Sequence, residues 1–128
     1  MSTPQTPAEV ASAILDAIEE VPDAFSMNSW ISLPSLSSLP PTGEPSCGTT
    51  MCVAGWAAHL TGWTLVDDGT IMVIPDADGV DTAIDVYAVK GDTARLVDDV
   101  ARDLLGPDIS FYADADTALE QLRVIAGR

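Results

Sequence analysis

The segment that follows Thr49 and Thr50 is almost entirely apolar as far as Gly62, and it constrains the fold more than any other feature. Either threonine can cap the first turn of a helix, and the glycine can end that helix in a left-handed conformation. A helix that is apolar on every side is a buried helix. The sequence therefore predicts a helix at the centre of the fold, with Gly55 allowing close approach of a neighbouring backbone and Trp56 filling volume.

Three further segments have the apolar periodicity of amphipathic helices. The first follows a capping box at Thr6-Pro7-Ala8-Glu9 and stops before Pro22. The second is capped by Asp92 and ends at Gly106-Pro107, and the third spans about residues 116–126. The residues expected to face inward are Val10, Ala13, Ile14, Ala17, Ile18, Val21, Val97, Val100, Ala101, Leu104, Ala118, Leu119, Leu122 and Ile125.

The remaining segments read as a hairpin, two loops and a weak helix. Residues 64–74 contain two β-prone runs around Asp68-Gly69, a dipeptide that suits a type I′ turn, so they predict one β-hairpin. Residues 75–81 predict a loop, and residues 82–89 a weak helix with an apolar side. The Ser- and Pro-rich residues 31–46 predict a surface loop.

The expected fold class is therefore mainly α (α+β), a compact bundle of four to five helices around a buried central helix, with one β-hairpin. We expect a single domain, residues 1–128, because this length and a hydrophobic content of 47% suit one core. No apolar run is long enough to cross a membrane, and residues 1–10 lack the basic and apolar regions of a secretory signal. These observations predict a cytoplasmic protein.

The chain carries far more negative than positive charge. It has 20 acidic and 5 basic residues, a formal net charge of −15, and residues 1–89 hold 12 acids and no base. Such a surface argues against direct binding of DNA or RNA. The acids serve solubility, or they face a basic partner. The candidates for partner-facing acids are Asp67, Asp68, Asp76, Asp78 and Asp81.

In the helix that Asp92 is expected to cap, the spacing predicts two ion pairs on the solvent side, Arg95 with Asp99 and Asp98 with Arg102. The acids of residues 76–81 also invite a calcium interpretation. They lack the order of an EF-hand loop and its final glutamate, so a turn is the better interpretation.

Cys47, Cys52 and His59 are the only candidates for thiol or metal chemistry. Along a continuous helix, a rise of about 1.5 Å per residue separates the histidine from the two cysteines by roughly 18 Å and 10 Å. That separation disfavours a cysteine nucleophile paired with a histidine base. Zinc needs four ligands, and no third cysteine or second histidine exists to complete the set. We expect no cofactor, and the cysteines are expected to pack in the core.

The run Cys47-Gly48-Thr49-x-x-Cys52-x-Ala54-Gly55-Trp56-Ala57 resembles the C-G-T-x-x-C-x-A-G-W-A signature of a family of small, largely uncharacterised proteins of actinobacteria and their bacteriophages. The resemblance extends over most of residues 24–112, but only the motif is specific. It implies a compact accessory protein of a phage or its host, and it implies no catalytic residue. Within this motif, Cys47, Gly48, Thr49, Cys52, Ala54, Gly55 and Trp56 are expected to have a structural role.

Three functions remain open after the sequence is read. The first is a non-enzymatic accessory protein that binds and modulates another protein. The second is an acidic mimic of DNA that inhibits a nucleic-acid-binding protein, although Asp16, Glu19, Glu20 and Asp23 form only a short acidic cluster. The third is a thiol- or zinc-dependent protein that uses Cys47 and Cys52. The expected partner is an unidentified protein, with no direct contact to nucleic acid or to a membrane.

Overall fold

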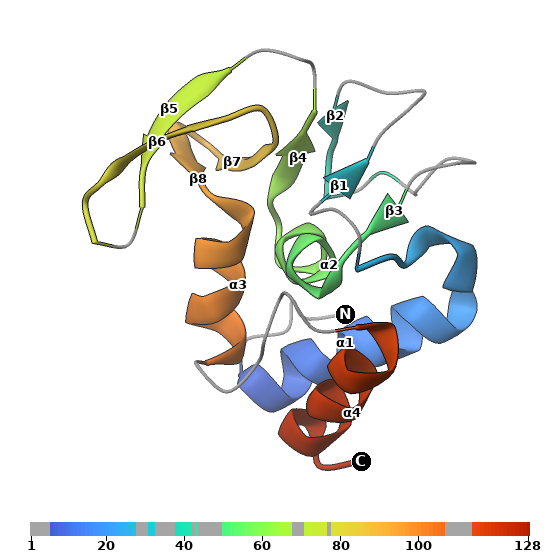
Figure 1. The fold of residues 1–128 in the computed structure, drawn as a ribbon. Helices are drawn as coiled ribbons and strands as arrows, with labels where there is room; N and C mark the ends of the chain where they lie inside the picture. The colour runs from blue at the N-terminus through green and yellow to red at the C-terminus, as the bar shows by residue number, and fades with distance from the viewer. Residues whose placement is uncertain are drawn as a thin grey trace.

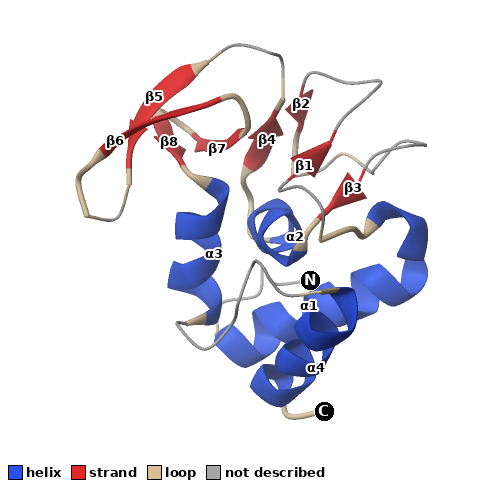
Figure 2. Cartoon of the chain, viewed as in Figure 1, coloured by secondary structure: helices blue, strands red, loops and turns tan. Residues whose placement is uncertain are grey.

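The computed structural model describes residues 6–27, 31–32, 38–41, 43, 50–67, 71–76, 78–106 and 114–128. These residues form four α-helices, one short 3₁₀ helix and eight short strands (Figures 1 and 2). The helices are α1 (Pro7–Glu20), η1 (Pro22–Ala24), α2 (Val53–Leu60), α3 (Val97–Leu105) and α4 (Ala115–Ala126). The strands are β1 (Ile31–Ser32), β2 (Ser38–Leu39), β3 (Thr50–Met51), β4 (Thr64–Val66), β5 (Met72–Pro75), β6 (Asp81–Ile84), β7 (Tyr87–Lys90) and β8 (Thr93–Arg95).

The predicted helical bundle with one hairpin is wrong as a fold class. The strands form three antiparallel sheets, in the orders β1-β3, β2-β4-β7-β8 and β5-β6. Each of these strands is two to four residues long, and several pair with partners distant in the chain. Local apolar periodicity does not show such pairings, because a short strand is stabilised by its neighbours rather than by its own sequence.

The central helix is confirmed. Every residue of α2 except Leu60 is buried, and α2 lies between α1, α3 and the strands (Figure 1). It starts later than predicted, because Thr50 pairs with Ser32 in the β1–β3 ladder and Cys52 takes the N-cap position. Thr49 lies outside the described residues. The exit glycine is confirmed, since Gly62 has a positive φ of 97°.

The first and last helices are also confirmed. The Thr6 hydroxyl accepts a hydrogen bond from the Glu9 backbone N–H at 3.1 Å, and the Glu9 carboxylate accepts one from the Thr6 N–H, which completes the predicted capping box of α1. Asp114 caps α4 by accepting from the Thr117 N–H at 2.8 Å. The apolar faces of α1 and α4 pack against each other below α2 (Figure 1).

Helix α3 has the predicted apolar face, but its start is different. Asp92 does not cap it, because Gly91 and Asp92 form the turn of the β7–β8 hairpin. Arg95 therefore lies in β8, and its guanidinium pairs with Asp103 at 2.7 Å instead of with Asp99. The other predicted pair, Arg102 with Asp98, is present at 3.1 Å.

The predicted hairpin around Asp68-Gly69 is wrong, although both β-prone runs do contain strands. Strand β4 lies inside its sheet between β2 and β7, so both of its edges are occupied and it cannot pair with β5. The predicted helix at residues 82–89 is also wrong. These residues form β6 and β7, whose threonine, isoleucine, tyrosine and valine side chains favour strands, and the pairing with β5 and β4 supplies their hydrogen bonds.

The surface loop predicted at residues 31–46 is corrected in part. Ile31–Ser32 and Ser38–Leu39 are strands, and Leu39 is fully buried against the core opposite Leu65 of β4. Burial of this leucine and the hydrogen bonds of the ladder hold the segment to the part of the protein built around α2, which we call the body. They do so in spite of the polar composition of the segment. Among the described residues, no helix is both long enough and apolar enough to cross a membrane.

Candidate functional site

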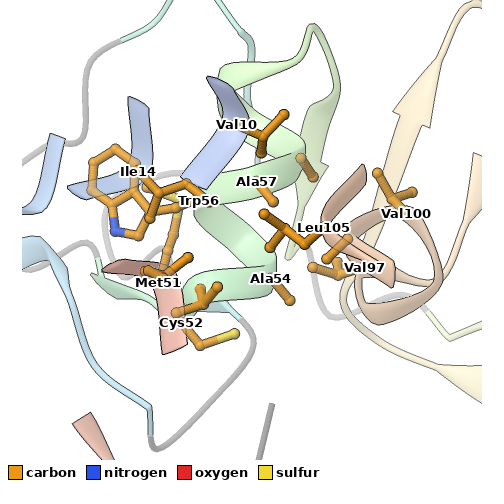
Figure 3. Close-up of a cluster of buried hydrophobic side chains, with 14 of the residues drawn as sticks. Val10, Ile14, Met51, Cys52, Ala54, Trp56, Ala57, Val97, Val100 and Leu105 are labelled. Carbon is orange, nitrogen blue, oxygen red and sulfur yellow. The ribbon is translucent and has the colours of Figure 1, made fainter. Parts of the chain in front are cut away.

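Cys52 is buried in the centre of the body. Its side chain belongs to the apolar cluster drawn in the close-up of the core (Figure 3), and the residue is 1% exposed. Burial raises the pKa of this thiol to about 11, because a thiolate would lose its hydration there, while backbone N–H groups of Gly55 and Ala54 oppose the shift. Cys52 is therefore a protonated packing residue at neutral pH rather than a nucleophile. Cys47 lies outside the described residues.

His59 is buried on the same helix, seven residues after Cys52, which places the two about 10 Å apart along the axis. Its ring meets that of Trp56 edge to face, with 5.9 Å between the ring centroids. Burial lowers the pKa of His59, so the imidazole is neutral at pH 7. Across the part of the chain that the structure describes, no three His, Cys, Asp or Glu side chains gather as metal ligands would.

Two buried polar atoms of α2 lack a hydrogen-bond partner among the described residues. These atoms are Trp56 Nε1 and His59 Nδ1. Both groups are single ring nitrogens on an apolar helix, and the neutral imidazole needs no counter-charge. With Cys52 protonated and His59 neutral about 10 Å away, the sequence motif does not bring a nucleophile and a base together within these residues.

The helical end of the molecule has two shallow grooves. One, of about 520 Å³, lies between α1 and α4 over Leu15, Ile18 and Leu119, with Arg123 at its side. The other, of about 630 Å³, lies between the start of α1 and α4, beside Leu105. The described residues that line the two grooves include no cysteine, serine or histidine, and the polar residues of the second groove are Thr117, Glu120 and Gln121.

A different surface stands out at the opposite end, on the β5–β6 hairpin. Its strands project from the body beyond β7 and β8 (Figure 1). Residues 76–80 connect the two strands; within this connection Asp76 accepts from the Gly79 N–H through its backbone oxygen, and Gly79 has a positive φ of 82°. The Asp76 carboxylate accepts two further bonds, from the N–H groups of Asp78 and Val80, each at 2.9 Å. The turn predicted for residues 76–81 is confirmed.

One face of the hairpin is held by the body. Ile74 is buried with Tyr87 and Leu96 in a second, smaller apolar cluster, and Met72 and Ile84 pack against that cluster. These three hairpin residues alternate with exposed ones along the strands, as the period of two in a strand requires. The inner face therefore fixes the position of the outer face.

The other face is apolar and exposed. Val73 of β5 lies opposite Ala83 of β6, and both side chains are exposed. The exposed fractions are 67% for Ile71, 64% for Val73 and 60% for Val80. We call Ile71, Val73 and Ala83 of this face, together with the exposed Val80 of the connection before β6, the hairpin patch. Sequence reasoning missed it, although the isoleucine-methionine-valine-isoleucine run before Pro75 indicated a strand with apolar residues on both faces.

The predicted partner-facing acids are placed differently from one another. Asp78 and Asp81 are exposed on the hairpin beside the patch. Asp76 is half-buried and holds the turn, and Asp67 is half-buried after β4. Asp68 lies outside the described residues. Asp85, which follows β6 and is exposed, joins the acids of the hairpin although the sequence analysis did not select it.

Comparisons with protein-family models, with curated proteins and with solved structures find no match to this chain.

Proposed function

We propose that this chain is a non-enzymatic accessory protein that acts in the cytoplasm of an actinobacterium, from the host's own genome or from a phage, and that binds and modulates another protein through the hairpin patch. The observation that supports it best is the exposure of Ile71, Val73 and Val80 on one projecting hairpin. The resemblance of the central motif supports the source.

The hairpin patch has the composition of a protein-binding surface. Most large apolar side chains of the described residues are buried, and three of the five that are prominently exposed lie on this hairpin. Exposed apolar side chains that gather in one place mark interaction sites more often than scattered ones do. Acids border the patch, as polar residues border the apolar centre of an interface.

The charge of the chain favours a partner of the opposite sign. Residues 71–89 contain four acids and no lysine, arginine or histidine, within a chain of net charge −15. A second copy would bring the same acids against these, and like charges across an interface cost several kcal/mol. A partner with an apolar centre and a lysine- or arginine-rich rim is complementary in both respects.

The test is affinity capture from an actinobacterial lysate with the tagged protein and two matched variants. Val73→Ser removes an exposed valine from the hairpin patch, and Val124→Ser removes a valine that is 76% exposed on α4. We expect the first variant to lose the captured protein, by about tenfold or more if Val73 is a buried anchor in the complex. The second variant should capture it as well as the wild type does.

Two results would contradict the proposal. If both variants capture the same protein with unchanged yield, the hairpin patch is not the binding surface. If capture falls steeply and linearly on a logarithmic salt scale and all captured proteins bind nucleic acid, the chain is a DNA mimic instead, because such proteins carry the basic surfaces that phosphates occupy.

A further inference from the structure

We infer that the partner adds a basic, extended segment to the free edge of β6, as an additional antiparallel strand. This inference rests on the proposed function and specifies its mode of recognition. Addition of a strand to an exposed edge uses main-chain hydrogen bonds for affinity and alternate side chains for specificity. The structure supplies the edge, its register and its charge.

The register shows which backbone groups are free. The Asp76 N–H donates to the Val80 oxygen at 2.9 Å, which is a bond in the direction of the ladder at the hairpin end, while the Val80 N–H donates to the Asp76 carboxylate. Pro75 has no N–H, so the Pro75–Asp81 pair is a non-hydrogen-bonded one. In an antiparallel ladder such pairs alternate with hydrogen-bonded ones. The next pairs are Ile74–Thr82 and Val73–Ala83. Thr82 therefore faces β5 with its backbone groups, while those of Asp81 and Ala83 point to the other edge.

That edge has no strand beside it among the described residues, because the sheet of β5 and β6 holds only these two strands. The outer edge of β5 is different. Pro75 sits there at a position whose nitrogen points outward and carries no hydrogen. On that edge β5 still offers the N–H and C=O of Val73, but it lacks a donor at Pro75, so β6 offers the more complete set of donors and acceptors to an incoming strand.

The side chains on this edge specify the incoming strand. Asp81 and Ala83 share the exposed outer face of the hairpin, and Asp85 follows two residues later, also exposed. Directly opposed residues of neighbouring strands have Cβ atoms about 5 Å apart, so opposite charges there attract and like charges repel. The edge thus favours lysine or arginine opposite Asp81 and Asp85 and an apolar residue opposite Ala83, where it would also approach Val73.

The same acids disfavour the pairing of two copies through this edge. Charged residues on edge strands are a common protection against edge-to-edge association. Here the protection has one sign only, since residues 71–89 contain no base. An edge that repels its own copy by negative charge remains open to a positive strand.

The experiment uses the full chain and a synthetic peptide, acetyl-Thr-Lys-Thr-Val-Thr-Lys-Thr-amide, as the probe. In the paired strand, the lysine and valine amides face β6 and the threonine amides face away. One peptide version is N-methylated at the lysine and valine residues, and the other at the second, third and fourth threonines. We expect the first version to bind at least about tenfold more weakly than the parent, and the second to bind within about twofold.

Two protein variants complete the test. A far-UV circular dichroism spectrum that matches that of the wild type shows that a variant folds. Ala83→Pro removes the outward N–H that β5 does not use, and we expect at least about a tenfold loss of peptide binding. Ala83→Val keeps the N–H and should bind within about twofold. If the proline variant does not fold, the methylated peptides still decide the question on the unaltered protein.

Equal binding of the two methylated peptides would overturn strand addition, and so would absence of parent peptide binding at millimolar concentration. Neither result would overturn the proposed function by itself. If Val73→Ser still loses the captured protein while the peptide results fail, the partner lies on the hairpin patch without pairing to β6. If Val73→Ser captures normally, the proposed function has failed.

Discussion

The body around α2 and the β5–β6 hairpin use the same kinds of side chain for opposite purposes. In the body, valines and isoleucines such as Val10, Ile14 and Val53 are fully buried, and the helices that carry them enclose one core. On the hairpin, Ile71 and Val73 are about two-thirds exposed, while only the inner face is held by a small cluster. Apolar residues in the first region stabilise the fold, and those in the second are available to another molecule.

The largest difference between the two regions should be seen in the free energy of unfolding. Ile14→Ala removes a fully buried side chain of α1 and should destabilise the protein by about 2–5 kcal/mol, because it loses burial and leaves a cavity. Val73→Ala changes an exposed side chain and should stay within about 0.5 kcal/mol. Urea denaturation followed by circular dichroism measures both. Equal effects would show that Val73 is a core residue and would break the comparison.

The rate at which a thiol reagent labels Cys52 tests whether the core excludes reagents. In a Cys47→Ser variant, a thiol reagent at pH 8 should label Cys52 very slowly in the folded state and quickly in urea, because burial raises its pKa to about 11 and excludes the reagent. Cys52→Ser should cost about 1–3 kcal/mol of stability, since a hydroxyl would be buried there. Fast labelling of the native variant would revive the thiol-dependent hypothesis.

His59 should make the free energy of unfolding depend on pH in a definite direction. Burial lowers its pKa in the folded state, so the unfolded state binds the proton first as pH falls below 6.5. Stability is then fully present above 6.5 and decreases on acidification, by at most about 1.4 kcal/mol per pH unit from this residue. Urea midpoints between pH 7.5 and 5 should show this slope, and His59→Gln should reduce it. A slope that the substitution leaves unchanged would assign the effect to carboxylates.

The smallest effect is expected at the hairpin turn. Asp76→Ala removes a carboxylate that accepts from the N–H groups of Asp78 and Val80, and it should loosen the hairpin by about 1–2 kcal/mol while leaving the core of the body intact. Amide exchange should therefore quicken in β5 and β6 but not in α2. Asp78→Ala, which changes an exposed neighbour with no such role, is the matched control. Equal acceleration in α2 would show that hairpin and body unfold as one unit.

The helices were predictable because each has its determinants in its own sequence. The capping box at Thr6 and Glu9, the apolar run of α2 and the stripe of α3 are local features. The strands were not, because β4 is determined by Leu39 and Ala88 on either side of it, and residues 82–89 gain their hydrogen bonds from β5 and β4. A period of two over four residues cannot be distinguished from a short helix without those neighbours.

The candidate site shows the same division. Asp78 and Asp81 were selected from the sequence because charge is readable there. Val73 and Ala83 were not, because their exposure depends on Ile74 and Ile84 being held from the other side by Tyr87 and Leu96. Which face of a strand is buried depends on what packs against it. The sequence of a strand that is apolar on both faces therefore does not show which face is buried.

Amide hydrogen exchange on the captured complex shows whether the hairpin binds the partner while the body only supports the hairpin. We expect slower exchange in residues 71–85 on binding, and unchanged exchange in α4, whose exposed Val124 lies on a different element. Protection confined to α1 and α4, with the hairpin amides exchanging as in the free protein, would contradict the account.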